Sequence, residues 1–380
     1  MRASILQICA ESTTLERFLR PLLPPLVAAG YRVEVMCGDA DKLGAGWPEE
    51  INLHIVPVSR TFDPVAAWRT VQGYRGVIRR GGFDLVHAQT SIAGLLGCLA
   101  ARMAGTRHVL YTQHGFYCHD HQSAPARGFW RWFESLAIRL CDLLICVSPA
   151  EMEQAHTAYP RLRPKLLLAP GPGIDTEPFT AVRLRRDEVR RQKRLELGIP
   201  SEAEVVLMIA RPRVDKGYPE LFEAFAEVVR RRQQTHLLVA GYGPGENPFQ
   251  RDLERLELTP RVKLLGWRQD VPELMAAADV FTLPSWHEGF ATSVAEALIA
   301  GTPVVGTDIP GIRFHVREGL DGYLVPVDNP PRLAEALCSA LAMRDRLSQH
   351  VLERSDALAT AYDTQTVARW YVDLYSRLLQ

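Results

Sequence analysis

The sequence predicts an α/β protein that contains two doubly wound parallel sheets, one in each half of the chain. Short apolar runs alternate with helix-length amphipathic segments, a pattern typical of parallel strands covered on both faces. A chain of 380 residues also exceeds the usual size of a single hydrophobic core. The expected strands are residues 4–9, 32–37, 53–58, 84–89, 108–113 and 142–148 in the first half, and 204–210, 236–241, 262–267, 279–284 and 302–307 in the second.

A segment rich in proline and glycine separates these two series of strands. The run Pro-Gly-Pro-Gly at residues 170–173 breaks any regular element and therefore marks a hinge. We expect a first domain over residues 1–172, a second over 173–362, and a final helix over 363–380 that packs back on the first domain. Ligands of doubly wound sheets bind at the carboxyl ends of the strands, so two such domains facing each other would form a binding cleft.

The composition excludes several classes of protein. The 44 basic and 44 acidic residues cancel, which argues against a nucleic-acid binder. The seven cysteines are scattered and include no C-x-x-C pair, so neither a disulfide framework nor a zinc ribbon is indicated. The longest apolar run, residues 92–101, is about half of what is needed to cross a bilayer. We therefore expect a cytoplasmic protein without a membrane span.

Two cations lie in the loop that follows the first expected strand of the second domain. Arg211 and Lys216 are five residues apart and come just before Gly217 and a helix pattern. Two cations at a helix N-terminus make an anion site that suits a diphosphate. The alternative is a pair of solvated surface charges.

A glycine-rich loop follows the next strand, with glycines at positions 241, 243 and 245. Loops of this kind are often plain turns. This one also lacks the downstream acid that a nicotinamide site requires, so it does not predict such a site.

Two carboxylates flank the start of an apolar helix pattern in the stretch HEGFATSVAEAL, at Glu288 and Glu296. Ser293 and Glu296 match a capping box, which would make Glu296 purely structural, and Glu288 could be an ordinary loop carboxylate. In the functional interpretation, Gly289 lets a ligand approach the backbone while the amides of residues 290–293 point at it. A carboxylate accepts two hydrogen bonds, which suits the vicinal hydroxyls of a sugar or a ribose.

Three stretches carry a resemblance to a known family. They are ARPRVDKG, the block LLGWRQDVPELMAAADVFTLPSWHEGFATSVAEALIAGTPVVGTDIPG with its Glu-x7-Glu spacing, and HAQTSIAGLLGCLAARMAGTRHVLYTQHGFY. Together they resemble the family-4 retaining glycosyltransferases, which have the GT-B fold: two Rossmann-like domains that face each other across a cleft. The resemblance covers nearly the whole chain.

The resemblance implies catalytic and binding roles for particular side chains. Arg211 and Lys216 would hold the donor diphosphate. Glu288 would contact hydroxyls of the transferred sugar, and Glu296 would hold the ribose. His114, in the stretch TQHGF, would face the reacting sugar from the first domain.

The resemblance also implies further contacts with the donor, with Gly266 and Trp267 beside the nucleobase. These further donor-binding positions are Gly241, Gly243, Gly266, Trp267, Gly289, Phe290, Ala291 and Thr292. Cations and helix N-termini can stabilise the departing diphosphate without a metal. We therefore expect a reaction that requires neither a metal nor another cofactor.

Three features bear on how far the family pattern applies. The first strand ends in CAESTTLERF instead of a glycine-rich turn, so only Ser12 and Thr13 could replace that turn near the phosphates. Asp39 and Asp41 form an Asp-x-Asp pair, the metal motif of the other major glycosyltransferase fold, but they lie far from the donor block. A cluster of possible metal ligands also occurs within eight residues, but its spacing fits no standard zinc site. It comprises His114, Cys118, His119 and His121.

The acceptor side is less well marked. The segment RGFWRWFESLAIRL has one stripe at helical spacing that we interpret as core, formed by Phe129, Trp132, Phe133, Leu136, Ala137 and Leu140. Trp130 and Arg131 fall off that stripe beside Arg127 and would form an aromatic and basic outer face for a membrane or acceptor. The basic run at 183–194 is interpreted as a solvated helix, with contact to anionic lipid or a lipid diphosphate as the alternative.

These observations predict a retaining, metal-independent glycosyltransferase in polysaccharide or glycoconjugate biosynthesis. The donor would be a UDP-hexose or UDP-N-acetylhexosamine, and the acceptor a glycan that a polyprenyl diphosphate could carry. The protein would then be cytoplasmic, with possible peripheral contact at the anionic inner face of the plasma membrane, and would bind no nucleic acid. Two alternatives stay open: a sugar-nucleotide 2-epimerase of the same fold and a non-catalytic nucleotide-sugar-binding subunit.

Overall fold

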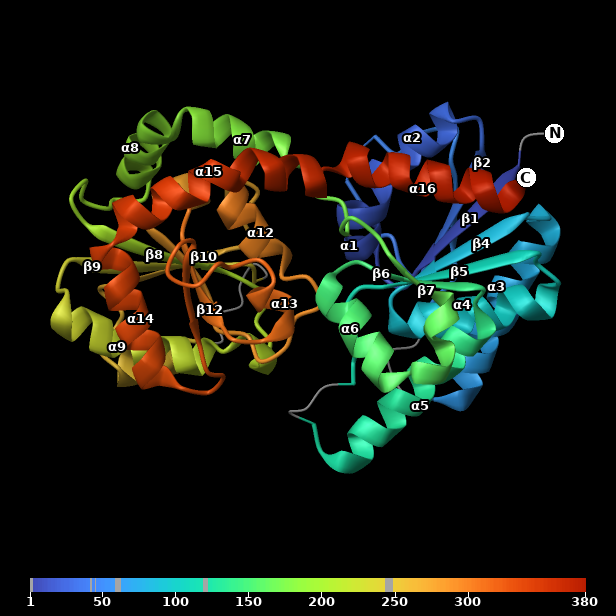
Figure 1. Cartoon of the computed structure of the whole chain (residues 1–380), viewed down its shortest axis with the longest axis horizontal. Coiled ribbons are helices and arrows are strands. Elements are labelled where there is room, and N and C mark those ends of the chain that lie inside the picture. The colour runs from blue at the N-terminus through green and yellow to red at the C-terminus, as the bar shows by residue number, and fades with distance from the viewer. Residues whose placement is uncertain (1–2, 42, 45, 59–62, 119–121, 243–248) are drawn as a thin grey trace. The chain divides into compact units, whose positions relative to one another are not determined.

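A computed structural model describes residues 3–41, 43–44, 46–58, 63–118, 122–242 and 249–380 (Figure 1). The chain divides into two compact units. The first unit comprises Met1–Asp175 together with Ala361–Gln380, and the second comprises Thr176–Thr360. The first unit is therefore built from two stretches of chain that are separated by the whole of the second.

The first unit contains a seven-stranded parallel sheet in the order β3-β2-β1-β4-β5-β6-β7. Sequence order reverses between β1 and β4, which makes their carboxyl ends the switch point of this sheet. The strands are β1 (Ser4–Cys9), β2 (Arg32–Cys37), β3 (Asn52–Ile55), β4 (Leu85–Gln89), β5 (His108–Gln113), β6 (Leu143–Cys146) and β7 (Leu166–Leu168).

Helices cover both faces of this sheet. Alternate strand residues serve opposite cores: Ile5 belongs to a cluster with α2 and α16, whereas Leu6 belongs to one with α3, α4 and α5. The final helix α16 lies beside α2 (Figure 1). The helices are α1 (Ser12–Thr14), α2 (Leu23–Ala28), α3 (Pro64–Gly81), α4 (Ser91–Ala104), α5 (Ala124–Leu140), α6 (Pro149–Ala158) and α16 (Thr364–Leu379), with short turns at η1 (Leu15–Leu19), η2 (Arg20–Leu22) and η3 (Pro160–Lys165).

The second unit contains a six-stranded parallel sheet in the order β10-β9-β8-β11-β12-β13, with its switch point between β8 and β11. Its strands are β8 (Glu204–Ile209), β9 (Thr235–Ala240), β10 (Val262–Gly266), β11 (Val280–Leu283), β12 (Val304–Thr307) and β13 (Gly322–Val325). Its helices are α7 (Glu177–Leu184), α8 (Arg186–Glu196), α9 (Tyr218–Arg231), α10 (Gln250–Arg255), α11 (Val271–Ala277), α12 (Thr292–Ile299), α13 (Pro310–Arg313), α14 (Pro330–Ala342) and α15 (Arg344–Tyr362), with η4 at Val214–Lys216.

The two sheets confirm the predicted fold class of two doubly wound parallel-sheet domains. Two edge strands were not predicted, β7 and β13. β7 lies just before the Pro-Gly-Pro-Gly run at 170–173, and both strands are too short to show a pattern of their own.

The basic run at 183–194 is solvated on one side only: Arg185 and Arg191 are exposed, whereas other arginines of the run are buried or half-buried. Arg194 is buried and bonds to Asp279 at 2.8 Å, while Arg190 bonds to the same carboxylate at 2.6 Å. Arg186 donates to the carbonyls of Ala300 and Gly301 at the end of α12. Carbonyls at helix C-termini attract cations, so these arginines tie α8 to its neighbours and do not form a solvated or lipid-binding face.

No helix in the described parts of the chain combines the length and the apolar composition that crossing a membrane requires.

Candidate functional site

Two loops meet at the switch point of the second sheet. Lys216 lies in the loop after β8 and Glu288 in the loop after β11, and the Lys216 Nζ lies 2.7 Å from the Glu288 Oε1. Both side chains are half-buried. The sequence prediction that these two residues belong to one site agrees with this contact, although their roles stay a prediction.

One further hydrogen bond orders the Glu288 loop, and another joins it to the Lys216 loop. The Ser285 hydroxyl donates to Glu288 Oε1 at 2.8 Å, and the Trp286 amide donates to the carbonyl of Asp215 at 2.8 Å. Burial works against ionisation of the Asp215 carboxyl, yet the nearby charges of Lys216 and Arg213 keep its pKa below the ordinary value. The site thus holds ionised groups of both signs side by side.

Glycines allow the two loops to approach at backbone distance. Gly217 has a φ of 71°, and a Cβ there would lie 2.1 Å from the carbonyl oxygen of Pro284. A Cβ on Gly311 would likewise lie 2.1 Å from the carbonyl oxygen of Glu288. Side chains at these positions would push the Glu288 loop away from its present place.

The start of α12 differs from the predicted capping box. The helix begins at Thr292, and its N-cap is Ala291, which has a left-handed φ of 50° and no side-chain cap. Ser293 therefore lies inside the first turn and is not the N-cap, so the capping-box alternative for Glu296 is wrong. Glu296 is buried on this helix. Gly289 and Phe290 lead directly into the left-handed turn.

His315 supports this turn and was missed by sequence reasoning. Its Nε2 lies 2.5 Å from the carbonyl oxygen of Phe290, and its ring packs edge-on against that of Phe290. Burial lowers the pKa of His315 to about 3, so the ring is neutral and its Nε2–H donates to the carbonyl. A single histidine between two arginines, Arg313 and Arg317, carries no sequence signal for this contact.

The other donor-binding positions lie at the same carboxyl edge of the sheet. The Gly241 amide donates to the Gly266 carbonyl at 2.9 Å, and a Cβ on Gly241 would lie 2.4 Å from the carbonyl oxygen of Ala210. Arg211 and Trp267 are exposed. Gly243 and Gly245 lie outside the described residues.

In the first unit, His114 follows β5. Its Nε2 lies 3.0 Å from the Gln89 Oε1, and its ring stacks on Phe18 with centroids 5.4 Å apart. Burial lowers the pKa of His114 to about 4, so the imidazole is neutral at pH 7.

Two buried carboxyl groups underlie the loop that carries His114. Glu134 on α5 accepts from the Tyr117 amide at 2.6 Å and from the Tyr159 hydroxyl at 2.7 Å. Glu151 on α6 accepts from the Val147 amide at 2.8 Å. Burial raises the pKa of Glu134 to about 7 and that of Glu151 to about 8. Sequence reasoning identified neither carboxyl group.

Asp39, one of the candidate metal ligands, bonds to Ser12 at the start of α1. Asp39 accepts from the amide of Ser12 at 3.1 Å and also from its hydroxyl. Within the described ranges, no group of three or more histidine, cysteine, aspartate or glutamate side chains could hold a metal ion. His119 and His121 lie outside those ranges.

The core stripe predicted for α5 is confirmed for Phe133, Leu136, Ala137 and Leu140 but wrong for Phe129 and Trp132. Trp130 is half-buried and stacks on Tyr117 with centroids 4.4 Å apart, whereas Phe129 and Trp132 are 40% and 62% exposed. The core stripe runs through Glu134 because its carboxyl group finds two hydrogen-bond donors. Arg131 is exposed as predicted, and Arg127 is half-buried.

Comparisons with known proteins agree with this architecture. Residues 15–177 match the model described as Glycosyltransferase Family 4, and residues 203–343 match the model described as Glycosyl transferases group 1. The chain is 30% identical over 341 residues to D-inositol 3-phosphate glycosyltransferase 1 of Catenulispora acidiphila, covering 84% of this chain and 75% of the relative.

A relative from Escherichia coli is also similar. UDP-Gal:alpha-D-GlcNAc-diphosphoundecaprenol alpha-1,3-galactosyltransferase is 25% identical over 311 residues, which cover 81% of this chain and 79% of the relative. Among solved structures, the sucrose-phosphate synthase of Thermosynechococcus elongatus has the same fold, with a TM-score of 0.82 at 21% identity over 100% of this chain and 99% of that chain. Together with the paired sheets and the matched family models, these relatives show that the chain belongs to the family-4 glycosyltransferases of the GT-B fold.

Proposed function

We propose that the protein transfers a hexose or N-acetylhexosamine from a UDP-linked donor to a glycan carried by a polyprenyl diphosphate. The observation that carries the donor part is the Lys216–Glu288 pair at the switch point of the second sheet. It offers a cation for phosphate and a carboxylate for sugar hydroxyls within 2.7 Å of each other. A sugar diphosphate presents these two kinds of group next to each other.

The acceptor part is supported by a relative. The E. coli galactosyltransferase acts, by its name, on a GlcNAc-diphosphoundecaprenol with UDP-Gal as donor. Membership of the same family makes a lipid-linked glycan the acceptor class to test first.

The proposed chemistry stabilises the departing UDP. As the bond from the sugar to the phosphate breaks, negative charge grows on the diphosphate, and Lys216 with Arg211 would bind it. Glu288 would orient the sugar through its hydroxyls, and Glu296 would hold the ribose. We further propose that transfer retains the anomeric configuration, that it needs no metal, and that His114 acts at the reacting sugar.

The test is a transfer assay with labelled UDP-glucose, UDP-galactose and their N-acetylhexosamine counterparts, with and without a synthetic polyprenyl-diphosphate glycan. We expect release of UDP that depends on the acceptor, an α-linkage in the product by NMR, and the same rate in excess EDTA. An epimerised sugar formed without acceptor would establish the epimerase alternative. UDP binding without turnover would establish the non-catalytic binding subunit. A rate abolished by EDTA and restored by magnesium or manganese would overturn metal independence and direct attention to Asp39 and Asp41.

A lipid-linked acceptor also requires the enzyme to reach a membrane surface, and α5 carries suitable groups. Phe129, Trp132 and Arg131 are exposed on this helix. Aromatic side chains gain free energy at the interface, and each nearby cation adds about 1 kcal/mol on an anionic leaflet. We propose that these residues, in place of Trp130, provide the peripheral contact.

We expect salt-sensitive co-sedimentation with anionic vesicles that falls several-fold in the Phe129→Ser/Trp132→Ser variant, because two interfacial anchors are lost. Trp68→Ser is the matched control, since Trp68 is 52% exposed on α3 of the same unit. Equal sedimentation with anionic and neutral vesicles at low salt would argue for an acceptor in solution.

A further inference from the structure

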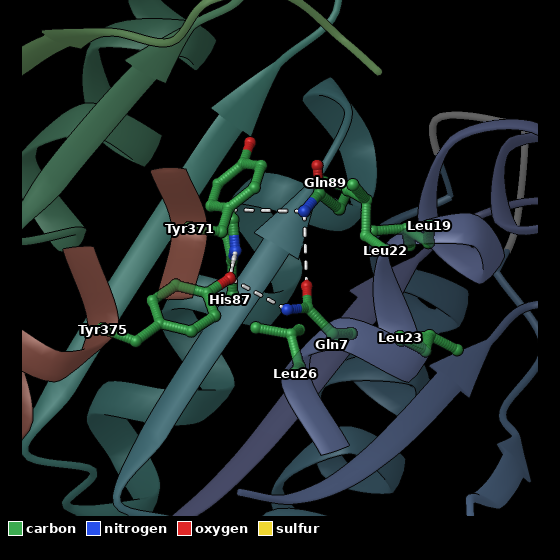
Figure 2. Close-up of a pocket in the computed structure, with 9 residues that line it drawn as sticks. All are labelled: Gln7, Leu19, Leu22, Leu23, Leu26, His87, Gln89, Tyr371 and Tyr375. Atoms are coloured by element: carbon green, nitrogen blue, oxygen red, sulfur yellow. Dashed lines mark hydrogen bonds between the residues drawn. The ribbon is translucent and has the colours of Figure 1, made fainter. Parts of the chain in front are cut away.

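A network of polar side chains lines part of a small buried cavity in the first unit (Figure 2). The cavity has a volume of about 10 Å³, room for one water at most, so it is not a ligand site. Leucines of η1, η2 and α2 form one wall, while Gln7, His87, Gln89 and Tyr375 form the polar one. The network joins α16 to the residue that contacts His114.

Hydrogen bonds connect these side chains in series. Gln7 Nε2 donates to the Tyr375 hydroxyl at 2.9 Å, and Gln89 Nε2 donates to Gln7 Oε1 at 3.3 Å. The remaining oxygen of the Gln89 amide lies 3.0 Å from His114 Nε2. If the Gln89 amide were reversed, its oxygen would face the Gln7 oxygen, and two acceptors would be in contact.

His87 determines the direction of the hydrogen bonds at Tyr375. Gln7 Nε2 and His87 Nδ1 lie 2.9 and 2.5 Å from the Tyr375 hydroxyl, and His87 Nε2 lies 2.7 Å from the Thr112 hydroxyl. An amide nitrogen cannot accept a hydrogen bond, whereas one ring nitrogen of a neutral histidine can. Burial lowers the pKa of His87 to about 3, so the ring is neutral. The Tyr375 O–H therefore donates to His87 Nδ1 while its oxygen accepts from Gln7, and His87 Nε2–H donates to the Thr112 hydroxyl.

The burial of these groups makes their orientation costly to change. Gln7, His87, Gln89 and Tyr375 are each at most 3% exposed, so a reversed amide would leave a buried polar atom unpaired. The oxygen of Gln89 thus has to accept, and the donor that it meets is Nε2–H of His114.

We propose that Gln89 is a positioning residue that holds His114 in the tautomer with its proton on Nε2, and that Tyr375 of α16 maintains Gln89 in this orientation through Gln7 and His87. The Nδ1 lone pair of His114 is then the one presented for chemistry. This rests on the proposed function only in assigning His114 an action at the reacting sugar; the tautomer itself is a property of the protein without substrate.

Nitrogen-15 NMR of protein labelled at histidine tests the tautomer directly. The His114 signal is identified by its loss in His114→Asn, and its nitrogen shifts distinguish Nε2–H from Nδ1–H. We expect Nε2–H in the wild type and a mixture of tautomers in Gln89→Leu and in Tyr375→Phe. In Gln89→Glu a carboxylate faces the ring, so we expect Nε2–H to be retained and the pKa of His114 to be raised. Tyr74→Phe is the control, because the hydroxyl of this buried tyrosine has no hydrogen-bond partner within the described part of the chain.

Kinetics of the same variants separate this proposal from the proposed function. We expect kcat to fall about tenfold in Gln89→Leu, the equivalent of one lost hydrogen bond, while KM for the donor and the kinetics of Tyr74→Phe stay unchanged. An Nε2–H signal that persists in both Gln89→Leu and Tyr375→Phe overturns the positioning role, whatever the rates. A tautomer that shifts while kcat does not would uphold the positioning role and overturn the action of His114 at the sugar.

Discussion

Replacing Lys216 by methionine is expected to lower kcat/KM for the nucleotide-sugar donor by about 100- to 1,000-fold, the cost of removing one preorganised charge from a developing anion. Methionine keeps the length and apolar stem of the side chain, so the loop after β8 retains its packing. The substitution also removes the cation that lies 2.7 Å from the half-buried carboxylate of Glu288, which then keeps only the hydrogen bond from Ser285 among its described contacts. Steady-state kinetics and calorimetry of UDP binding measure both consequences.

Lys193→Met provides a matched control. Lys193 is a lysine of the same unit with a similarly shielded side chain, 12% exposed against 15% for Lys216, and it also pairs with carboxylates, those of Glu196 and Asp270. We expect Lys193→Met to bind UDP and turn over donor normally. Donor kinetics that are unchanged in Lys216→Met would remove this residue from the diphosphate site.

A second large effect is expected from pH, acting through the buried carboxyl group of Glu151. Its pKa is raised from 4.5 to about 8 in the folded protein, so between these values the folded state holds a proton that the unfolded state has lost. The free energy of unfolding must therefore fall as pH rises from about 4.5 to about 8, by roughly 3 to 5 kcal/mol for a shift of this size. Glu134 adds a fall of the same sign up to about pH 7.

Glu151→Gln should remove most of this pH dependence, because the amide keeps an oxygen for the Val147 amide and carries no charge at any pH. Urea unfolding of the wild type and the variant at intervals from pH 5 to pH 9 measures the two slopes. Glu153→Gln is the control, since Glu153 is exposed on the same helix. Parallel slopes in wild type and Glu151→Gln would show that this carboxyl group stays ionised in the fold.

The fold class could be predicted from sequence because the strands repeat one pattern. Strands buried on both faces are mostly apolar, and this holds for β1, β8 and β9, each of which has only one or two polar residues among six. The Lys216–Glu288 site was also predictable in part, since each residue directly follows a strand of such a sheet, and neighbouring strands end at one edge.

Other features depend on contacts that local sequence does not encode. The first turns of the buried face of α5 were misassigned because Glu134 interrupts the apolar stripe. Burial of Glu134 becomes favourable only when Tyr117 and Tyr159 supply donors from elsewhere in the chain. Arg194 was assigned to a solvated face for the same reason, since Asp279 lies 85 residues away. Pattern reasoning assumes that charged residues face water, and both residues violate that assumption by pairing.

The two-stretch construction of the first unit has a consequence for its biosynthesis. Val367, Tyr371 and Tyr375 of α16 share a core with Ile5 and Leu85, yet a ribosome reaches them only after it has translated the whole of Thr176–Thr360. Until then one face of the sheet in the nascent first unit is covered only by η1, η2 and α2, and the apolar remainder is a surface on which chaperones act. The second unit is one continuous stretch of chain, so all of its core residues are available once Thr360 has been translated. During translation, the half of the protein that is made first is therefore the half that matures last.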